Sequence, residues 1–145
     1  MNELEIAKYL RADKFTSQFF NGVLAYDLLP VGKAPLGLYV VNTDLSTNPG
    51  KHWVCVFLDN VVCEYFDSLG EPPIEVEKFI KAQGKEYAYS KKRIQSTDSN
   101  VCGDYCILFA YYKCRGFSLE SYIDIFTNDT NYNDALVRLD SDKLL

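Results

Sequence analysis

The sequence predicts an α+β fold: a small mixed β-sheet packed against helices, with a cysteine at the N-terminus of a central helix. Two observations predict it. Runs rich in β-branched and aromatic residues, typical of strands, occupy positions 36–41, 52–58, 61–67 and 87–94. The polar stretch 95–101 then ends at Cys102, and the apolar run 107–112 follows closely, which is typical of a buried helix.

Length and composition set the size and class of the protein. With 145 residues, 48% hydrophobic and 14% aromatic, the chain suits one domain over residues 1–145 with a substantial core. The net charge of -5 and the isoelectric point near 4.8 argue against a main role in neutralising nucleic-acid phosphates. The sequence shows neither a secretory signal pattern nor an apolar run of membrane-spanning length, so we expect an intracellular protein with no membrane partner.

Cysteine and histidine usage bears on redox and metal chemistry. The five cysteines are Cys55, Cys63, Cys102, Cys106 and Cys114. An odd number without a C-x-x-C pair favours a reducing compartment over a disulfide framework. A zinc site is not expected, because one histidine without paired-ligand spacing does not supply a tetrahedral ligand set. We therefore expect neither a metal nor another cofactor.

The first third of the chain contains a helix and a strand. Residues 3–12 are strong helix formers, and Asn2 is a candidate N-cap. Residues 15–30 are interrupted by glycine and proline, which predicts a short helix or turn followed by irregular chain. The strand 36–41 then breaks into a polar loop that ends at Lys51.

The next two strands form a predicted hairpin. Residues 52–58 and 61–67 are joined by Asp59-Asn60, and such residues suit a two-residue turn. If the loop consists of these two residues alone, His52 lies directly across from Asp67, with Cβ atoms ~5 Å apart. The histidine then has a carboxylate that can orient its ring.

Caps and stop signals delimit the remaining elements. They are a helix over 74–83 that stops at Gly84, a strand over 87–94 whose basic run Lys91-Lys92-Arg93 is typical of a solvated edge, the central helix from Cys102 to a stop at Gly116, a helix over 119–126 capped by Ser118, a helix over 130–139, and frayed residues 140–145.

The position of Cys102 favours chemical reactivity. Unpaired N–H groups and the positive dipole end of a helix stabilise a thiolate, which makes a cysteine there a better nucleophile than one in a core. The following Gly103 would let a substrate backbone come close to the sulfur. The alternative is that Cys102 is a small buried hydrophobic residue, the commoner fate of an intracellular cysteine.

Three side chains supply the parts of a thiol hydrolase. Cys102 is the candidate nucleophile, His52 the base and Asp67 the group that orients the base. Gln95, in the polar loop seven residues before Cys102, could donate its amide N–H to the oxygen of a tetrahedral intermediate. The alternatives are a structural histidine, an aspartate that serves a turn and a glutamine on a loop surface.

Three sequence blocks resemble the adenain family, the maturation proteases of adenoviruses, whose clan also contains the Ulp-type SUMO proteases. The blocks are His52-Trp53 after a Pro-Gly loop, Tyr65-Phe66-Asp67-Ser68-Leu69-Gly70, and Gln95 through Cys102-Gly103-Asp104-Tyr105-Cys106. The order His, acid, Gln, Cys and the seven-residue step from Gln to Cys also match that family.

The resemblance implies a cysteine protease in which Cys102, His52, Asp67 and Gln95 take the roles given above. Trp53 would line a narrow substrate channel that favours glycine near the cleaved bond. The implied substrates are polypeptides, namely viral capsid or core precursors, in the nucleus or cytoplasm of a host cell and in the virion. The alternatives are removal of SUMO or ubiquitin from conjugates by the same residues, or an inactive interaction module.

The sequence departs from the adenain pattern at three points. Asp67 stands where adenain has glutamate, although Ulp-type relatives use aspartate. The chain after Cys102 is much shorter than in adenain. Adenain is basic and is activated by DNA and by a disulfide-linked peptide, whereas this chain is acidic and has Gly84 near the place expected for the linking cysteine. These features argue against both activators.

Overall fold

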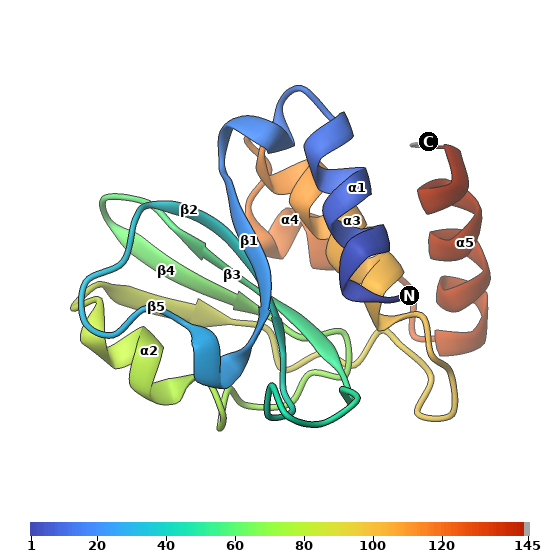
Figure 1. Cartoon of the computed structure of the whole chain (residues 1–145). Coiled ribbons are helices and arrows are strands. Elements are labelled where there is room, and N and C mark those ends of the chain that lie inside the picture. The colour runs from blue at the N-terminus through green and yellow to red at the C-terminus, as the bar shows by residue number, and fades with distance from the viewer. Residues whose placement is uncertain (144–145) are drawn as a thin grey trace.

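The computed structural model describes residues 1–143, which form one β-sheet with helices on both faces (Figure 1). In chain order the elements, with η denoting 3-10 helices, are α1 (Glu3–Ala12), η1 (Thr16–Gln18), β1 (Phe20–Ala25), η2 (Tyr26–Leu28), β2 (Gly37–Asn42), β3 (Trp53–Leu58), β4 (Val62–Phe66), α2 (Glu77–Ala82), β5 (Glu86–Tyr89), α3 (Cys102–Lys113), α4 (Leu119–Ile123) and α5 (Thr130–Lys143).

The sheet is mixed, as predicted. Its strand order is β1-β2-β3-β4-β5. The two outer pairs, β1 with β2 and β4 with β5, are parallel, whereas β2-β3 and β3-β4 are antiparallel. The α+β architecture predicted from the sequence is therefore confirmed.

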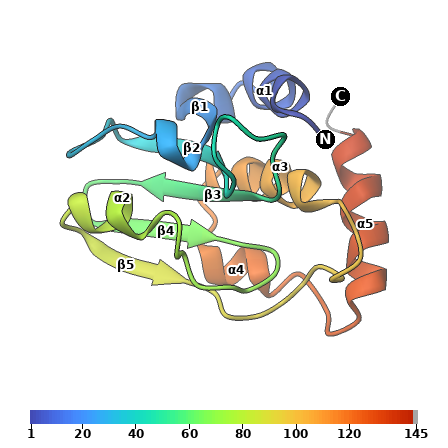
Figure 2. The same ribbon diagram turned by 60° about the horizontal axis from the view of Figure 1, so that its bottom comes forward.

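Each face of the sheet covers its own hydrophobic cluster. Alternate side chains of β2 and β3, among them Val40 and Cys55, pack with α1, α3 and α4 on one face. The intervening residues, among them Val41 and Val56, pack with Phe79 of α2 on the other face. Figure 2 shows α3 running beside β3, and α5 packed against the N-terminal end of α3.

The prediction of irregular chain after residue 18 is wrong, because Phe20–Ala25 form strand β1. This strand pairs in parallel with β2, and its register shifts between Phe20 and Gly22. Gly22 has φ 154, which accommodates the irregularity but also interrupts the strand pattern in the sequence. Strand β1 pairs with β2 across an intervening segment, and the local β-propensity of the residues does not predict such long-range pairing.

The predicted hairpin exists, but its turn lies one residue further along the chain. Each residue of β3 therefore pairs two positions further along β4 than predicted. Leu58 pairs with Cys63, and Asp59 N–H donates to the Val62 carbonyl, so the two central turn residues are Asn60 and Val61. The side chain of Asp59 accepts hydrogen bonds from both Val61 N and Val62 N, at 2.8 and 2.7 Å. This Asp side chain favours the observed turn over the predicted one.

Several predicted boundaries also move. Helix α2 begins at Glu77 rather than residue 74, since turns after Pro72 and Pro73 come first. Strand β5 ends at Tyr89, so the basic run lies beyond it, although β5 is the expected edge strand. Helix α4 ends at Ile123, three residues earlier than predicted.

The C-terminal helix is longer than predicted. Residues 140–143 are helical rather than frayed, because buried Ser141 docks on α3 by donating to Asp104 Oδ1 at 2.6 Å. Residues 144–145 of the predicted frayed end lie outside the described residues.

The predicted capping signals are confirmed. The Asn2 side chain accepts from Glu5 N and the Ser118 side chain from Ser121 N, so each caps its helix. Gly116 has φ 96 and its N–H donates to the Lys113 carbonyl just past the end of α3. Within residues 1–143 no helix combines the length and the apolar character that a bilayer crossing requires.

Candidate active site

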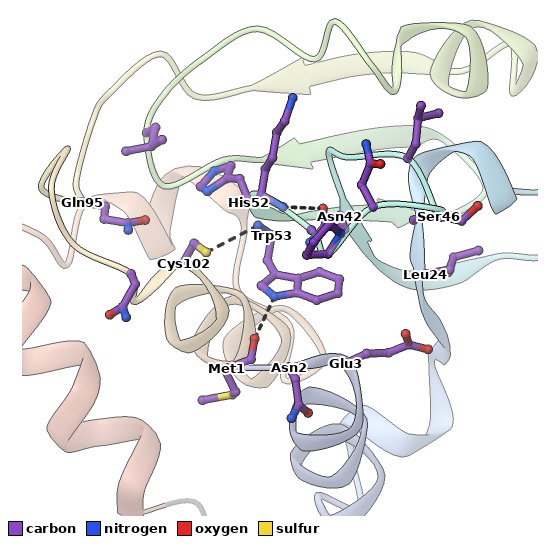
Figure 3. Close-up of a pocket in the computed structure, with 18 of the residues that line it drawn as sticks. Met1, Asn2, Glu3, Leu24, Asn42, Ser46, His52, Trp53, Gln95 and Cys102 are labelled. Carbon is purple, nitrogen blue, oxygen red and sulfur yellow. Dashed lines mark hydrogen bonds between the residues drawn. The ribbon is translucent and has the colours of Figure 1, made fainter.

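A groove brings together the side chains that the sequence singled out. It has a volume of about 720 Å³ and is lined by residues from five separated parts of the chain, which are the N-terminal residues, β1 with η2, the loop between β2 and β3, the turn after β4, and the loop before α3. His52, Trp53, Gln95 and Cys102 all line it (Figure 3). Their catalytic roles remain predictions, but their convergence is a structural observation.

Cys102 occupies the first turn of α3, as predicted, with 9% of its surface exposed. The Trp53 backbone N–H donates to its sulfur at 3.5 Å. Burial alone would raise the pKa of the Cys102 thiol, but hydrogen bonding and charge from His52, together with the N–H groups of Trp53 and Gly103, lower it below its ordinary value. The environment therefore favours a thiolate.

His52 immediately precedes β3 and its ring bridges the acid and the sulfur. Its Nε2 lies 2.6 Å from Asp67 Oδ1, which leaves Nδ1 as the ring nitrogen for Cys102. Burial alone would lower the pKa of the His52 imidazole, but its hydrogen bonds to Asp67 and to Cys102 raise the pKa to about 9. The three groups are arranged to hold a thiolate–imidazolium pair.

The Asn42 side chain stabilises the loop between β2 and β3, which places His52 in the groove. The Asn42 side-chain oxygen accepts from Asp44 N at 2.9 Å and from Lys51 N at 3.0 Å, and so ties the two ends of the loop together. The backbone of Gly50 passes close to this amide: a Cβ on Gly50, which has φ +105, would lie 2.9 Å from Asn42 Nδ2. This role of Asn42 was not predicted, since the sequence showed only the polar character of the loop.

Asp67 ends the hairpin in a tight turn. The Gly70 N–H donates to the Asp67 carbonyl at 2.9 Å, and Leu69 N donates to Asp67 Oδ1 at 2.9 Å. The same carboxylate oxygen therefore bonds both to the imidazole and to a backbone N–H of its own turn. Gly70 is required here because its φ is +70 and an added Cβ would lie 2.5 Å from the Lys91 carbonyl oxygen.

Gln95 is buried beside the groove, with 2% of its surface exposed. Its Oε1 accepts from Ser68 Oγ at 2.5 Å. Its Nε2 donates to the Ser99 carbonyl at 3.2 Å and to Ser99 Oγ at 3.1 Å. Gln95 is therefore no exposed loop residue. Neither serine was predicted to have a role, although both lie inside the motif blocks.

Trp53 forms part of the groove wall, as predicted, and its indole Nε1 donates to the Met1 carbonyl at 3.0 Å. The N-terminal residues Met1, Asn2 and Glu3 consequently lie along the groove (Figure 3). No sequence pattern indicated this, because the contact joins positions more than fifty residues apart.

Gly103 does not itself line the groove, and it lies against packed side chains. A Cβ at this position would lie 3.1 Å from Met1 Cβ, 3.5 Å from Ile6 Cδ1 and 3.6 Å from Trp53 Cδ1. A glycine therefore allows α3 to approach the N-terminal segment closely. The predicted contact between Gly103 and a substrate backbone finds no support in this geometry.

Cys63, Cys106 and Cys114 differ from Cys102 in the direction of their pKa shifts. All five are free thiols. Burial raises the pKa of Cys63 to about 12 and that of Cys114 to about 11, and it raises the pKa of Cys106 well above its ordinary value. Among residues 1–143 no group of three or more His, Cys, Asp or Glu side chains is arranged to hold a metal ion. The thiol at the groove is thus electrostatically distinct.

Comparison with known proteins places this geometry in context. The chain is 27% identical over 146 residues to a cysteine protease of African swine fever virus from a Malawi tick isolate, covering 90% of this chain and 50% of that protein. It is 30% identical over 104 residues to the SUMO-1 cysteine protease of a Kenyan pig isolate, covering 62% of this chain and 38% of that protein. The chain thus spans about half the length of the curated relatives it matches. No family model matches the sequence.

Solved structures agree with the fold. A crystal structure of the African swine fever virus protease matches with a TM-score of 0.52 at 25% identity, covering 72% of this chain and 44% of that one. The SUMO protease Ulp1, with its catalytic cysteine oxidised to a sulfinic acid, matches with a TM-score of 0.50 at 13% identity, covering 97% and 78%.

The comparisons confirm the resemblance to the clan of cysteine proteases that includes the Ulp-type enzymes, and they agree with the expectation of a viral cysteine protease. The African swine fever virus protein of the Kenyan isolate is described as a SUMO-1 cysteine protease, which agrees with the SUMO-protease-like alternative better than with the adenain-like main prediction. Cleavage of virion precursors remains a prediction.

Proposed function

We propose that this chain is a cysteine protease that hydrolyses peptide or isopeptide bonds through a thioester on Cys102. One observation carries the proposal: the His52 ring lies 2.6 Å from Asp67 and lowers the pKa of the Cys102 thiol, and a groove lined by His52 and Cys102 opens beside them. A buried acid, an imidazole and a thiol of lowered pKa in one groove are what nucleophilic acyl transfer requires.

In the proposed acylation step the Cys102 thiolate adds to the substrate carbonyl carbon. The developing oxyanion accepts hydrogen bonds from the Cys102 backbone N–H and the Gln95 amide. The tetrahedral intermediate then expels the amine, which takes its proton from the His52 imidazolium. Asp67 keeps the ring oriented and stabilises its charge.

Deacylation reverses these roles. His52, now neutral, accepts a proton from a water molecule, whose oxygen attacks the thioester. The second intermediate collapses and releases a carboxylic acid, which then loses its proton to solvent, and Cys102 leaves as a thiolate beside the newly formed imidazolium. The cycle thus returns the site to its starting charge state without a cofactor.

The substrates that we propose first are conjugates or precursors of ubiquitin-like proteins. The supporting observations are the names of the relatives, which include SUMO-1 cysteine protease and SUMO protease, and the indole of Trp53 in the groove wall beside Cys102. A flat aromatic wall next to the nucleophile suits an extended backbone without side chains, which is what a glycine-rich C-terminus presents.

Viral precursor polypeptides are the second candidate substrates. The viral source of the relatives and the adenain-like sequence blocks favour them. Such precursors would present glycine-containing sites to the same groove, inside an infected cell or a maturing virion. The catalytic residues do not separate the two substrate classes, so the experiment has to do so.

The test compares C-terminal fluorogenic amides of SUMO-1 and of ubiquitin with a peptide of similar length that contains an internal Gly-Gly-Xaa site. Cleavage of the ubiquitin-like amides with kcat/KM at least tenfold higher than for the peptide supports the first substrate class, and the reverse supports the second. The controls are Cys102→Ala, which should abolish turnover, and Cys63→Ala, which removes a buried thiol of high pKa and should leave turnover intact.

Labelling by iodoacetamide distinguishes a slow enzyme from an inactive interaction module. The proposed site requires Cys102 to react faster than the other four cysteines, because its thiolate is stabilised. Equal labelling of all five cysteines, together with no cleavage of any substrate, would overturn the proposed function.

A further inference from the structure

The turn that follows β4 contains two consecutive polar residues that serve different parts of the groove. Asp67 bonds to His52, whereas the next residue, Ser68, bonds to Gln95. Ser68 is completely buried. Its hydroxyl is therefore unavailable to solvent and must find its partner inside the protein.

Ser68 holds both the backbone and the side chain of Gln95. The Ser68 carbonyl accepts from Ile94 N at 2.9 Å and from Gln95 N at 3.0 Å. The Ser68 hydroxyl donates to Gln95 Oε1 at 2.5 Å. These three bonds fix where the glutamine leaves the backbone and where its amide ends.

The bonds also determine how the amide is oriented, with its NH₂ group directed at Ser99, a residue that lines the groove. The Ser99 carbonyl can only accept, so the NH₂ group of Gln95 must point toward it, at 3.2 Å. The oxygen end is then directed at Ser68. Without the Ser68 hydroxyl, Oε1 would be a buried acceptor without a partner, and the amide would gain freedom to rotate.

We propose that Ser68 is a positioning residue that orients the Gln95 amide for oxyanion binding; this inference rests on the function proposed above. The turn Asp67-Ser68 then orients the general base through one residue and the oxyanion donor through the next. An error of orientation in this donor would weaken transition-state binding without affecting ground-state substrate binding, since the oxyanion exists only after attack.

The test is a double-mutant cycle of Ser68→Ala and Gln95→Ala. Ser68→Ala should lower kcat about tenfold or more, within the loss expected for an impaired oxyanion donor, and change KM less than about twofold. In the Gln95→Ala background it should have no further effect, because Ser68 acts through the amide that is already absent. The rate of Cys102 alkylation should stay unchanged in all these variants.

Ser141→Ala is the matched control. Ser141 is also completely buried and donates to a side-chain oxygen, that of Asp104, at 2.6 Å, but it does not line the groove. The Ser141→Ala variant should have a lower unfolding midpoint and an unaltered kcat. If Ser68→Ala fails to fold, Ser68→Cys retains the size of the side chain with a weaker donor, and it should show a smaller loss of kcat that also disappears in the Gln95→Ala background.

Two results would overturn the inference: full kcat in Ser68→Ala or in Ser68→Cys, or an equal loss in the presence and absence of Gln95. An activity-independent readout separates this inference from the proposed function. The side-chain ¹⁵NH₂ protons of Gln95 should be protected from exchange in the unsubstituted protein and lose protection in Ser68→Ala. If the unsubstituted protein cleaves nothing, the proposed function fails, and unchanged protection of these protons would still refute the positioning role.

Discussion

His52 Nε2 and Asp67 Oδ1 lie 2.6 Å apart, although the two residues do not face each other across the hairpin. Continuing the register of β3 on β4, in which Cys55 pairs with Phe66, places Leu69 opposite His52. Asp67 is the diagonal neighbour on the same face, within reach of a long or aromatic side chain. The His52 side chain is long enough to span this diagonal, and the turn closed by Gly70 directs the Asp67 carboxylate toward the imidazole.

Asp67→Asn should reduce kcat by at least about tenfold, because it removes the negative charge that orients and stabilises the imidazolium. The same change should lower the pKa of His52 and thereby return the pKa of Cys102 toward its ordinary value. Stopped assays of kcat and the pH dependence of iodoacetamide labelling measure both effects. Asp59→Asn changes another turn aspartate, outside the groove, and should alter neither; unchanged kinetics in Asp67→Asn would remove this residue from the mechanism.

The reactivity of Cys102 should depend on pH in a defined direction. The pKa of the thiol is lowered and the pKa of His52 is raised to about 9, so the thiolate–imidazolium pair exists between the two values. Alkylation of Cys102 should therefore reach half its maximum at a lower pH than alkylation of a free cysteine. Turnover should decline as pH rises through about 9, since His52 then loses the proton that the leaving amine needs. A labelling midpoint at or above that of free cysteine would contradict the predicted pair.

Gly70→Ala should disrupt the turn that carries Asp67. The alanine would need φ near +70 and its Cβ would lie 2.5 Å from the Lys91 carbonyl oxygen. We expect a loss of about 1–3 kcal/mol in the free energy of unfolding, measured by urea denaturation, together with a lower kcat. Gly32→Ala is the control, because φ is +77 there but nothing lies within 4 Å of the added Cβ. Equal losses of stability and activity in the two variants would argue against the role of the close approach.

Asn42→Ala should loosen the loop before His52. It removes the oxygen that accepts from Asp44 N and Lys51 N. The buried Asp44 N–H left without a partner costs about 1–3 kcal/mol, whereas Lys51 is exposed and water can replace the lost acceptor. We expect lower stability and slower alkylation of Cys102, since His52 is less well held. Asn42→Asp keeps an acceptor oxygen and should restore most of the alkylation rate; if it behaves like the alanine variant, acceptance by the side chain is not what matters.

Trp53→Ala should raise KM for an extended peptide, because the indole forms part of the groove wall. Labelling of Cys102 by iodoacetamide, which is too small to need the wall, should change much less. Trp53→Phe retains an aromatic ring but loses the donor to the Met1 carbonyl, and so separates the wall from the tether. A KM in Trp53→Phe as high as in Trp53→Ala would assign the effect to the tether.

Local signals made much of the fold predictable. Asn2 and Ser118 cap the helices that follow them, and α3 begins at Cys102, because capping and helix initiation depend on residues within one turn. The hairpin register and strand β1 were not predictable in the same way. Both depend on which distant backbone a strand meets, and the Asp59 side chain shifted the turn by one residue.

The candidate site shows the same division. Cys102, His52, Asp67 and Gln95 were identifiable from residue type, order and resemblance, and all of them converge. Gly103 was expected to face substrate but packs against Met1 and Ile6. The environment of a residue depends on elements that are distant in the sequence, and local residue patterns do not predict which of them pack against it.

The sequence by itself determined the chemical groups available and the helix end on which the thiol sits, because these follow from side-chain identity and short-range backbone preference. Only the tertiary structure decided that the Ser68 hydroxyl meets the Gln95 amide, and that the N-terminal residues border the groove. Those contacts join positions 27 and more residues apart, and they arise when packing of both sheet faces fixes the paths of the connecting loops.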